Sequence, residues 1–272
     1  MKFGRLSIVV STHAAQFEAV AFKGDFEANV AKIAGWGYEG VELAIRDPDL
    51  VDAAQLEKLL ATYRLKVPAI GTGQAWGEEK LSFTSADGAI RKSAIDRIKR
   101  QIEFAQRFEA LVIIGLIRGI TPSGQTHTQS MKFLVDGLKE CAEKATNFGV
   151  RMALEPLNRY ETDLVHTVQD GLKIIQQVGS SNLGLLLDTF HMNIEEANIE
   201  KSIQQSADQI FHFHVADSNR WYPGGGHLDF STILRNLRSN GYQGWISGEF
   251  MPIPDANTAA ERSISYLKQV LI

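Results

Sequence analysis

The stretch VRMALEPLNRYET, residues 150–162, begins as an apolar run, stops on a carboxylate, Glu155, and continues at once with Pro156. A charge at the end of a buried strand is costly unless water, a partner or a cation compensates it. Seven other short runs rich in Val, Ile and Leu alternate with segments of helical period along the chain. The eight runs are residues 6–10, 40–44, 66–70, 110–115, 150–155, 183–188, 210–215 and 244–250.

Helical segments lie between these runs and carry the residues that begin and end helices. Asp25 and Asp87 each precede such a segment, and Gly149 follows another where a C-terminal glycine belongs. Eight strands, each followed by a helix and with no linker between them, predict a single α/β domain over residues 1–272, a (β/α)8 TIM barrel. An open doubly wound sheet competes, but it usually has a glycine-rich turn after its first strand, where this chain reads STHAAQF.

The composition favours a small-molecule enzyme of the cytoplasm. The chain is 44% hydrophobic and 22% charged with a formal net charge of −4, and its Lys and Arg residues are scattered, which argues against a nucleic-acid partner. No apolar run approaches the roughly 18 residues of a membrane span, and the start resembles a strand rather than a secretory signal. Cys141 is the only cysteine, so neither an intrachain disulfide nor a cysteine-based metal cluster is expected. A homo-oligomer is left open.

Four potential metal ligands end four consecutive runs of the expected barrel. They are Glu155, Asp188, His214 and Glu249, and in a barrel these strand ends meet at one mouth. Three carboxylates at one mouth repel one another, and a bound cation is the simplest relief. His212 shares a strand face with His214, but the position of His214 nearer the strand end favours it. The ligand set suits one divalent ion, with Mn²⁺ the first expectation and Co²⁺, Mg²⁺ or Zn²⁺ the alternatives.

The phrases EPLNRYET, DTFHMNIEE, FHFHVADSNRWYPG and GEF resemble the sugar isomerase and epimerase barrels of the D-tagatose 3-epimerase type, over nearly the whole chain. The stretches LAIRDP, AIGTGQAW and ALVIIGLIRG resemble those members that act on 5-keto-L-gluconate, a keto-acid sugar. The resemblance implies a metal-dependent epimerase that inverts the carbon beside the ketone, giving D-tagaturonate. The alternatives are a free ketose 3-epimerase, acting on D-tagatose, D-fructose, D-psicose or L-ribulose, and a lyase like inosose dehydratase.

The resemblance also implies roles for individual residues. Glu155 and Glu249 would be the acid/base pair as well as metal ligands, and Glu161, His191 and Arg220 would contact the substrate's oxygens. The chemistry explains the pair, because inversion removes a proton from one face of a carbon and returns one to the other. A cis-enediolate would form between these steps and would need stabilisation of its negative charge.

Two arginines are candidates for holding the carboxylate of a keto acid. Arg46 follows the second run and Arg118 follows the fourth, both at the expected catalytic mouth, and a guanidinium binds a carboxylate bidentately. Arg118 is preferred because no acidic residue follows it within ten positions. His13, Trp76 and Trp221 lie near strand ends, but the sequence assigns them no role.

A metal-dependent nuclease of the same barrel type is a further possibility. Such an enzyme needs additional histidines from the third and fourth strands, and here those strands run into Gly71-Thr72-Gly73 and Gly115-Leu116. The chain also lacks the basic face that binds DNA, so the nuclease is disfavoured.

Overall fold

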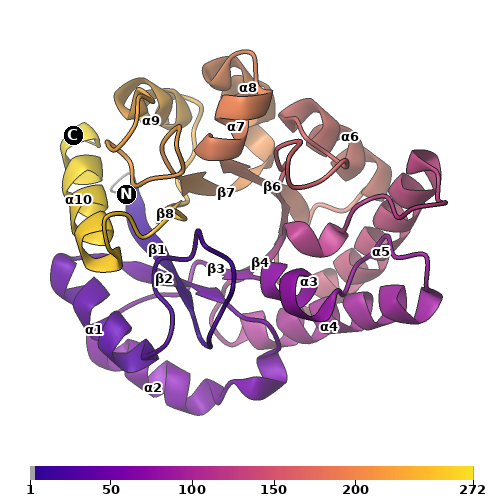
Figure 1. Ribbon diagram of the computed structural model, residues 1–272, viewed down its shortest axis with the longest axis horizontal. Helices are drawn as coiled ribbons and strands as arrows, with labels where there is room; N and C mark the ends of the chain where they lie inside the picture. The colour runs from indigo at the N-terminus through magenta and orange to yellow at the C-terminus, as the bar shows by residue number, and fades with distance from the viewer. Residues whose placement is uncertain (1–3, 272) are drawn as a thin grey trace.

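The computed structural model describes residues 4–271, which form a closed barrel of eight parallel strands surrounded by helices (Figure 1). Each strand pairs with its sequence neighbours, and β1 pairs with β8 to close the barrel. The TIM-barrel prediction is confirmed, while residues 1–3 and 272 of the predicted domain lie outside the described residues. The strands are β1 (Arg5–Ser11), β2 (Gly40–Ala44), β3 (Ala69–Gly71), β4 (Leu111–Ile114), β5 (Met152–Leu154), β6 (Leu183–Asp188), β7 (Ile210–Val215) and β8 (Trp245–Gly248).

Helices cover the outside of the barrel, and two short ones sit near its mouth. The α-helices are α1 (Phe26–Trp36), α2 (Ala53–Tyr63), α3 (Gly73–Glu79), α4 (Gly88–Gln106), α5 (His127–Phe148), α6 (Val168–Val178), α7 (Thr189–Glu195), α8 (Ile199–Ser206), α9 (Phe230–Ser239) and α10 (Ala256–Val270). Short 3₁₀ helices cover Pro48–Leu50, Leu116–Arg118 and Ala207–Gln209. The short helices α3 and α7 begin directly after β3 and β6, so they carry side chains into the catalytic end of the barrel.

The predicted helix caps are confirmed. The Asp25 side chain accepts a hydrogen bond from the backbone of Ala28, and Asp87 caps α4 in the same way through Ala89. Gly149 ends α5 in the left-handed conformation, with φ 65°, where a side chain would be strained. These caps separate strand from helix sharply, which fixes where each strand end points.

One predicted strand is displaced. The run 66–70 becomes a strand only at Ala69–Gly71, and Lys66 forms an isolated bridge with Gly40. Pro68 explains the difference, because a proline has no N–H to donate to a neighbouring strand. The shift places Gly71 at the end of β3, where it lines the cavity described below.

The strands are buried on both faces, as expected for a barrel with helices outside and side chains inside. A small apolar cluster of Ala69, Leu111, Ile113, Ala153 and Leu186 fills the interior below the catalytic end. In the part of the chain that the structure describes, no helix combines the length and apolar character of a membrane span.

Candidate active site

Four side chains from the ends of β5 to β8 converge inside the barrel mouth. The Nδ1 atom of His214 lies 3.9 Å from Oε1 of Glu155, 3.8 Å from Oδ2 of Asp188 and 3.9 Å from Oε2 of Glu249. All four ligand atoms lie within 4.8 Å of one another. Strand register contributes directly, because Asp188 and His214 are partners on neighbouring strands. This four-residue cluster is the set of side chains that the sequence predicted to meet.

The cluster has the properties of a cation site. Oε1 of Glu155, Oδ2 of Asp188 and Nδ1 of His214 are buried and have no hydrogen-bond partner within residues 4–271. Burial raises the pKa of Glu155 well above its usual range, and the charge of Glu249 raises it further. Burial likewise raises the pKa of Glu249 to about 7, although the positive charges of His214 and Arg220 oppose the shift. A divalent ion would relieve this repulsion and satisfy the unpaired atoms, so the residues fit such a group.

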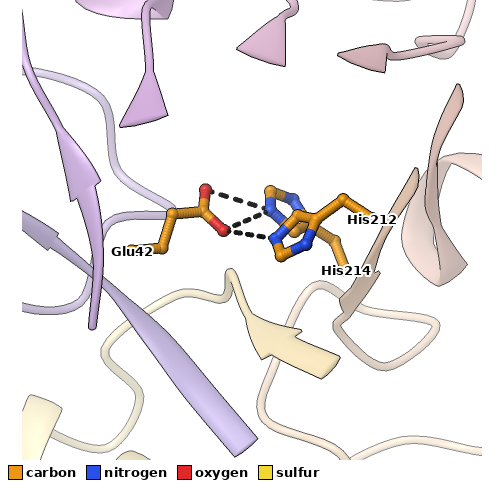
Figure 2. Close-up of side chains that lie close together, drawn as sticks. All are labelled: Glu42, His212 and His214. Carbon is orange, nitrogen blue, oxygen red and sulfur yellow. Dashed lines mark hydrogen bonds and ion pairs between the residues drawn. The ribbon is translucent and has the colours of Figure 1, made fainter. Parts of the chain in front are cut away.

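The other ring nitrogen of His214, Nε2, contacts a carboxylate that the sequence analysis did not single out. Nε2 of His214 lies 3.0 Å and 2.9 Å from the two oxygens of Glu42, and Nε2 of His212 lies 2.8 Å from Oε2 of the same group (Figure 2). His214 therefore joins the cluster and His212 does not, as strand position had favoured. Burial lowers the pKa of His214, but the carboxylates of Glu42, Glu249 and Glu155 outweigh it and raise that pKa to about 10.

His191, on α7, directs one ring nitrogen at the cluster. The backbone N–H of Asn158 donates to its Nδ1 at 3.3 Å, which leaves the ring proton on Nε2 when the imidazole is neutral. That Nε2 has no hydrogen-bond partner among the described residues and lies 3.9 Å from Oε1 of Glu155. Burial and the nearby charge of Arg220 lower the pKa of His191 well below its usual value. A neutral imidazole with an unused N–H therefore faces the cavity.

Arg220 and Glu161 form the charged rim of the same site. Nη1 of Arg220 lies 2.7 Å from Oε1 of Glu161, and its Nη2 lies 3.8 Å from Oε2 of Glu249. The guanidinium also sits over the rings of Phe17 and Phe190, at 5.1 Å and 4.7 Å from their centres. Stacking and the ion pair together hold this cation in place beside the four-residue cluster.

These groups line a cavity of about 260 Å³ at the carboxyl ends of the strands. The second half of the barrel supplies most of its chemistry, through Glu155, Glu161, His191, His214, Arg220 and Glu249. The first half supplies mostly small or apolar surface, including Val9, Phe17, Val20, Ala44, Gly71, Gly115 and Leu116. A glycine is needed at position 115, because a Cβ there would lie only 2.8 Å from Oε2 of Glu155.

Arg118 is not at this cavity. Its side chain is fully buried, and its guanidinium donates to the backbone carbonyls of Gly115 at 3.0 Å and Val165 at 3.3 Å, with longer contacts to Leu164 and Ile114. The sequence suggested a substrate clamp because no acidic partner was in reach, but backbone carbonyls are its partners instead. The arrangement makes Arg118 a link between the loops that follow β4 and β5.

Arg46 also has protein partners. Its Nη1 lies 2.8 Å from Oε2 of Glu78 and its Nε lies 3.3 Å from Oε1 of Glu79, both on α3. Glu78 lines the cavity, so the glutamate of this ion pair faces the cavity and Arg46 lies behind it. Two acidic residues that follow Arg46 closely in the sequence, Asp47 and Asp49, pair with Arg97 and Arg100 instead.

His13, Trp76 and Trp221, to which the sequence assigned no role, are absent from the described residues that line the cavity. His13 lies instead in a separate hollow beside α1 and α2. Among the residues that sequence reasoning missed, Glu42 carried a recognisable signal: a carboxylate in the middle of the apolar run GVELA. The helix α3, which brings Gln74 and Glu78 to the cavity, gave no comparable signal because its seven residues are glycine-rich.

The later strands of this TIM barrel bring three carboxylates and a histidine together beside one cavity at the carboxyl ends of the strands, which is where enzymes of this fold have their active sites. Comparison with known proteins agrees: the model of the xylose isomerase-like TIM barrel family matches residues 30–270. The chain belongs to that family, and within it to the ketose 3-epimerases of the D-tagatose 3-epimerase type, so it is an isomerase.

Individual relatives cover nearly the whole chain. The L-ribulose 3-epimerase of Mesorhizobium japonicum is 30% identical over 94% of this chain and 86% of its own length. An L-ribulose 3-epimerase of Methylomonas sp. is 31% identical over 85% of this chain and 82% of its own length. The crystal structure of D-allulose 3-epimerase from Methylomonas sp. in complex with D-allulose superposes with a TM-score of 0.83 at 25% identity, covering 99% of this chain and 98% of that one.

Proposed function

We propose that this enzyme epimerises an uncharged ketose at the carbon beside its ketone, with a single divalent cation held by Glu155, Asp188, His214 and Glu249. The observation that carries the proposal is the convergence of four ligand atoms beside a cavity of about 260 Å³, three of them buried and without a hydrogen-bond partner among the described residues. A cation bound there would supply a Lewis acid for the ketone oxygen and would keep the carboxylates ionised.

Glu155 and Glu249 move the proton in this proposal. They end β5 and β8, which are separated by β6 and β7 in the barrel, so they approach a central substrate from different directions. One carboxylate removes the proton from the carbon beside the ketone, and the other returns a proton to the opposite face. The Nε2–H of His191 and the guanidinium of Arg220 are placed to donate to the oxygens of the enediolate between these steps. The apolar side chains from the first half of the barrel exclude water from this enediolate.

An uncharged substrate is favoured by the charge of the cavity wall. Five glutamates line the cavity, and among the described lining residues Arg220 is the one Lys or Arg side chain; the glutamates are Glu42, Glu78, Glu155, Glu161 and Glu249. Arg220 is already paired with Glu161. A substrate carboxylate would therefore meet several like charges, whereas hydroxyl groups can accept from Arg220 and donate to the glutamates.

A keto acid such as 5-keto-L-gluconate is the second candidate, and Arg220 is the observation that favours it. Its guanidinium is the group that could turn from Glu161 to a substrate carboxylate. We expect kcat/KM to be higher for L-ribulose, D-tagatose or D-fructose than for 5-keto-L-gluconate. Measuring kcat/KM for all four substrates decides between the candidates, and a clear preference for the keto acid would overturn the uncharged-substrate proposal.

The cation site has its own prediction. The wild-type protein is expected to bind one divalent ion per chain, and His214→Ala and Asp188→Asn are expected to weaken that binding by on the order of 100-fold, because each removes a proposed direct ligand. Equilibrium dialysis against Mn²⁺, Co²⁺, Zn²⁺ and Mg²⁺ with elemental analysis measures the effect. Glu196→Gln is a suitable control, since Glu196 bonds Val168 and Ser202, outside the site. Undiminished binding by His214→Ala would remove His214 from the ligand set.

A further inference from the structure

Glu42 is a buried carboxylate that the proposed reaction does not use. It lies in the middle of β2 with 1% of its surface exposed, and it reaches across the barrel interior to β7 (Figure 2). Its two oxygens receive three contacts from His212 and His214, at 2.8 to 3.0 Å, each from a ring Nε2. Two imidazoles therefore share one carboxylate, in a region where an unpaired charge would be costly.

These contacts decide which nitrogen of His214 is available to a ligand. A carboxylate only accepts hydrogen bonds, so the ring proton of His214 that faces Glu42 must sit on Nε2. Nδ1 is then the atom that can give its lone pair to a cation, and this atom faces Glu155, Asp188 and Glu249. A ring held from behind in this way loses less freedom when it binds a metal.

We propose that Glu42 is a positioning residue for the cation site: it fixes the ring of His214 and keeps the proton on Nε2, so that Nδ1 is presented to the metal. The inference rests on the proposed cation site. Glu42 also lines the cavity, but the histidines engage both of its oxygens, so it acts on the ion through His214.

The shared geometry explains why a carboxylate rather than an amide occupies this position. Both oxygens of Glu42 lie within 3.0 Å of Nε2 of His214, so a glutamine in its place directs its NH₂ group at that nitrogen in either orientation of the amide. This N–H donor favours the tautomer in which His214 accepts at Nε2 and carries its proton on Nδ1. For His214 this tautomer places a proton where the ion must bind.

The test compares one change at each end of the contact between Glu42 and His212. Glu42→Gln should weaken Mn²⁺ binding by about 10- to 100-fold, as loss of a carboxylate behind a metal-binding histidine typically does. His212→Gln keeps an N–H directed at Glu42 and leaves the carboxylate to His214, so its Mn²⁺ affinity should stay within about threefold of wild type. Chelator competition gives the dissociation constants, and the midpoint of thermal unfolding without metal is recorded for each protein.

A purely structural role for Glu42 predicts a different pattern. In that case both variants would lower the midpoint of unfolding, and neither would change Mn²⁺ affinity by more than the Glu196→Gln control. Unchanged affinity in a folded Glu42→Gln protein would overturn the inference while leaving the cation site intact. Absence of Mn²⁺ binding by wild type would instead refute the site on which it rests. Should Glu42→Gln fail to fold, Glu42→Asp is the second variant: it keeps both acceptors on a shorter side chain, and affinity equal to wild type despite the lost reach would count against the inference.

Discussion

Glu249→Gln and Glu155→Gln are each expected to lower the rate of inversion by about 10²- to 10⁴-fold, the range associated with a positioned general acid or base. Wild-type enzyme in deuterated water should place deuterium at the inverted carbon. One carboxylate removes the substrate's proton, and the other returns a different one, which it has taken from the solvent. Each variant keeps one carboxylate, so slow exchange of the substrate proton without inversion is compatible with the two-base mechanism. Proton and deuterium NMR of the product measures both quantities.

Metal content must be measured in the same samples, since both glutamates are also proposed ligands. Glu196→Gln provides the matched control, and it should retain inversion, because its carboxylate accepts hydrogen bonds from Val168 and Ser202, outside the site. Inversion by wild type without deuterium incorporation would contradict exchange with solvent through two separate carboxylates. It would require a single group that carries the proton from one face to the other.

Arg118→Met is expected to lower the free energy of unfolding by about 3–5 kcal/mol, comparable to the loss of one member of a buried charged pair. The substitution keeps most of the side-chain volume but leaves the carbonyls of Gly115 and Val165 without their donor, and buried unpaired acceptors are costly. Urea unfolding followed by circular dichroism measures the change. Arg46→Met is the matched control: Arg46 is about one-third exposed, so its loss should cost about 1 kcal/mol or less.

The same pair of variants separates a structural Arg118 from the substrate clamp that the sequence suggested. A stable Arg118→Met protein that lost turnover of 5-keto-L-gluconate alone would restore the clamp. The contacts in the structure lead us to expect the opposite, a less stable protein with no selective loss for the keto acid.

The periodic apolar runs were sufficient to predict the barrel, because a strand that is buried on both faces is apolar along its length whatever its neighbours are. They also located the four-residue cluster, since strand ends in a barrel meet by necessity. The start of β3 was predicted too early because apolar character outweighed the missing N–H of Pro68. Glu42 was missed because its partner His212 lies 170 positions away on another strand, and no local pattern encodes such a contact. Arg118 was misread because its partners are backbone carbonyls, of Gly115 close by and of Val165 47 positions away, and side-chain patterns do not reveal carbonyl acceptors.

The uneven lining of the cavity has a consequence for how enzymes of this design diversify. Proton transfer and cation binding are assigned to strands β5 to β8, whereas Val9, Ala44 and Gly71 of the first half mainly set the room left for the sugar. Substitutions in β1 to β3 and in the loops that follow them, with Glu42 kept, can reshape the space for the sugar while the reactive groups keep their places. Selectivity can thus evolve independently of reactivity, and a library aimed at new ketoses should randomise the lining of the first half apart from Glu42 and leave the second half unchanged.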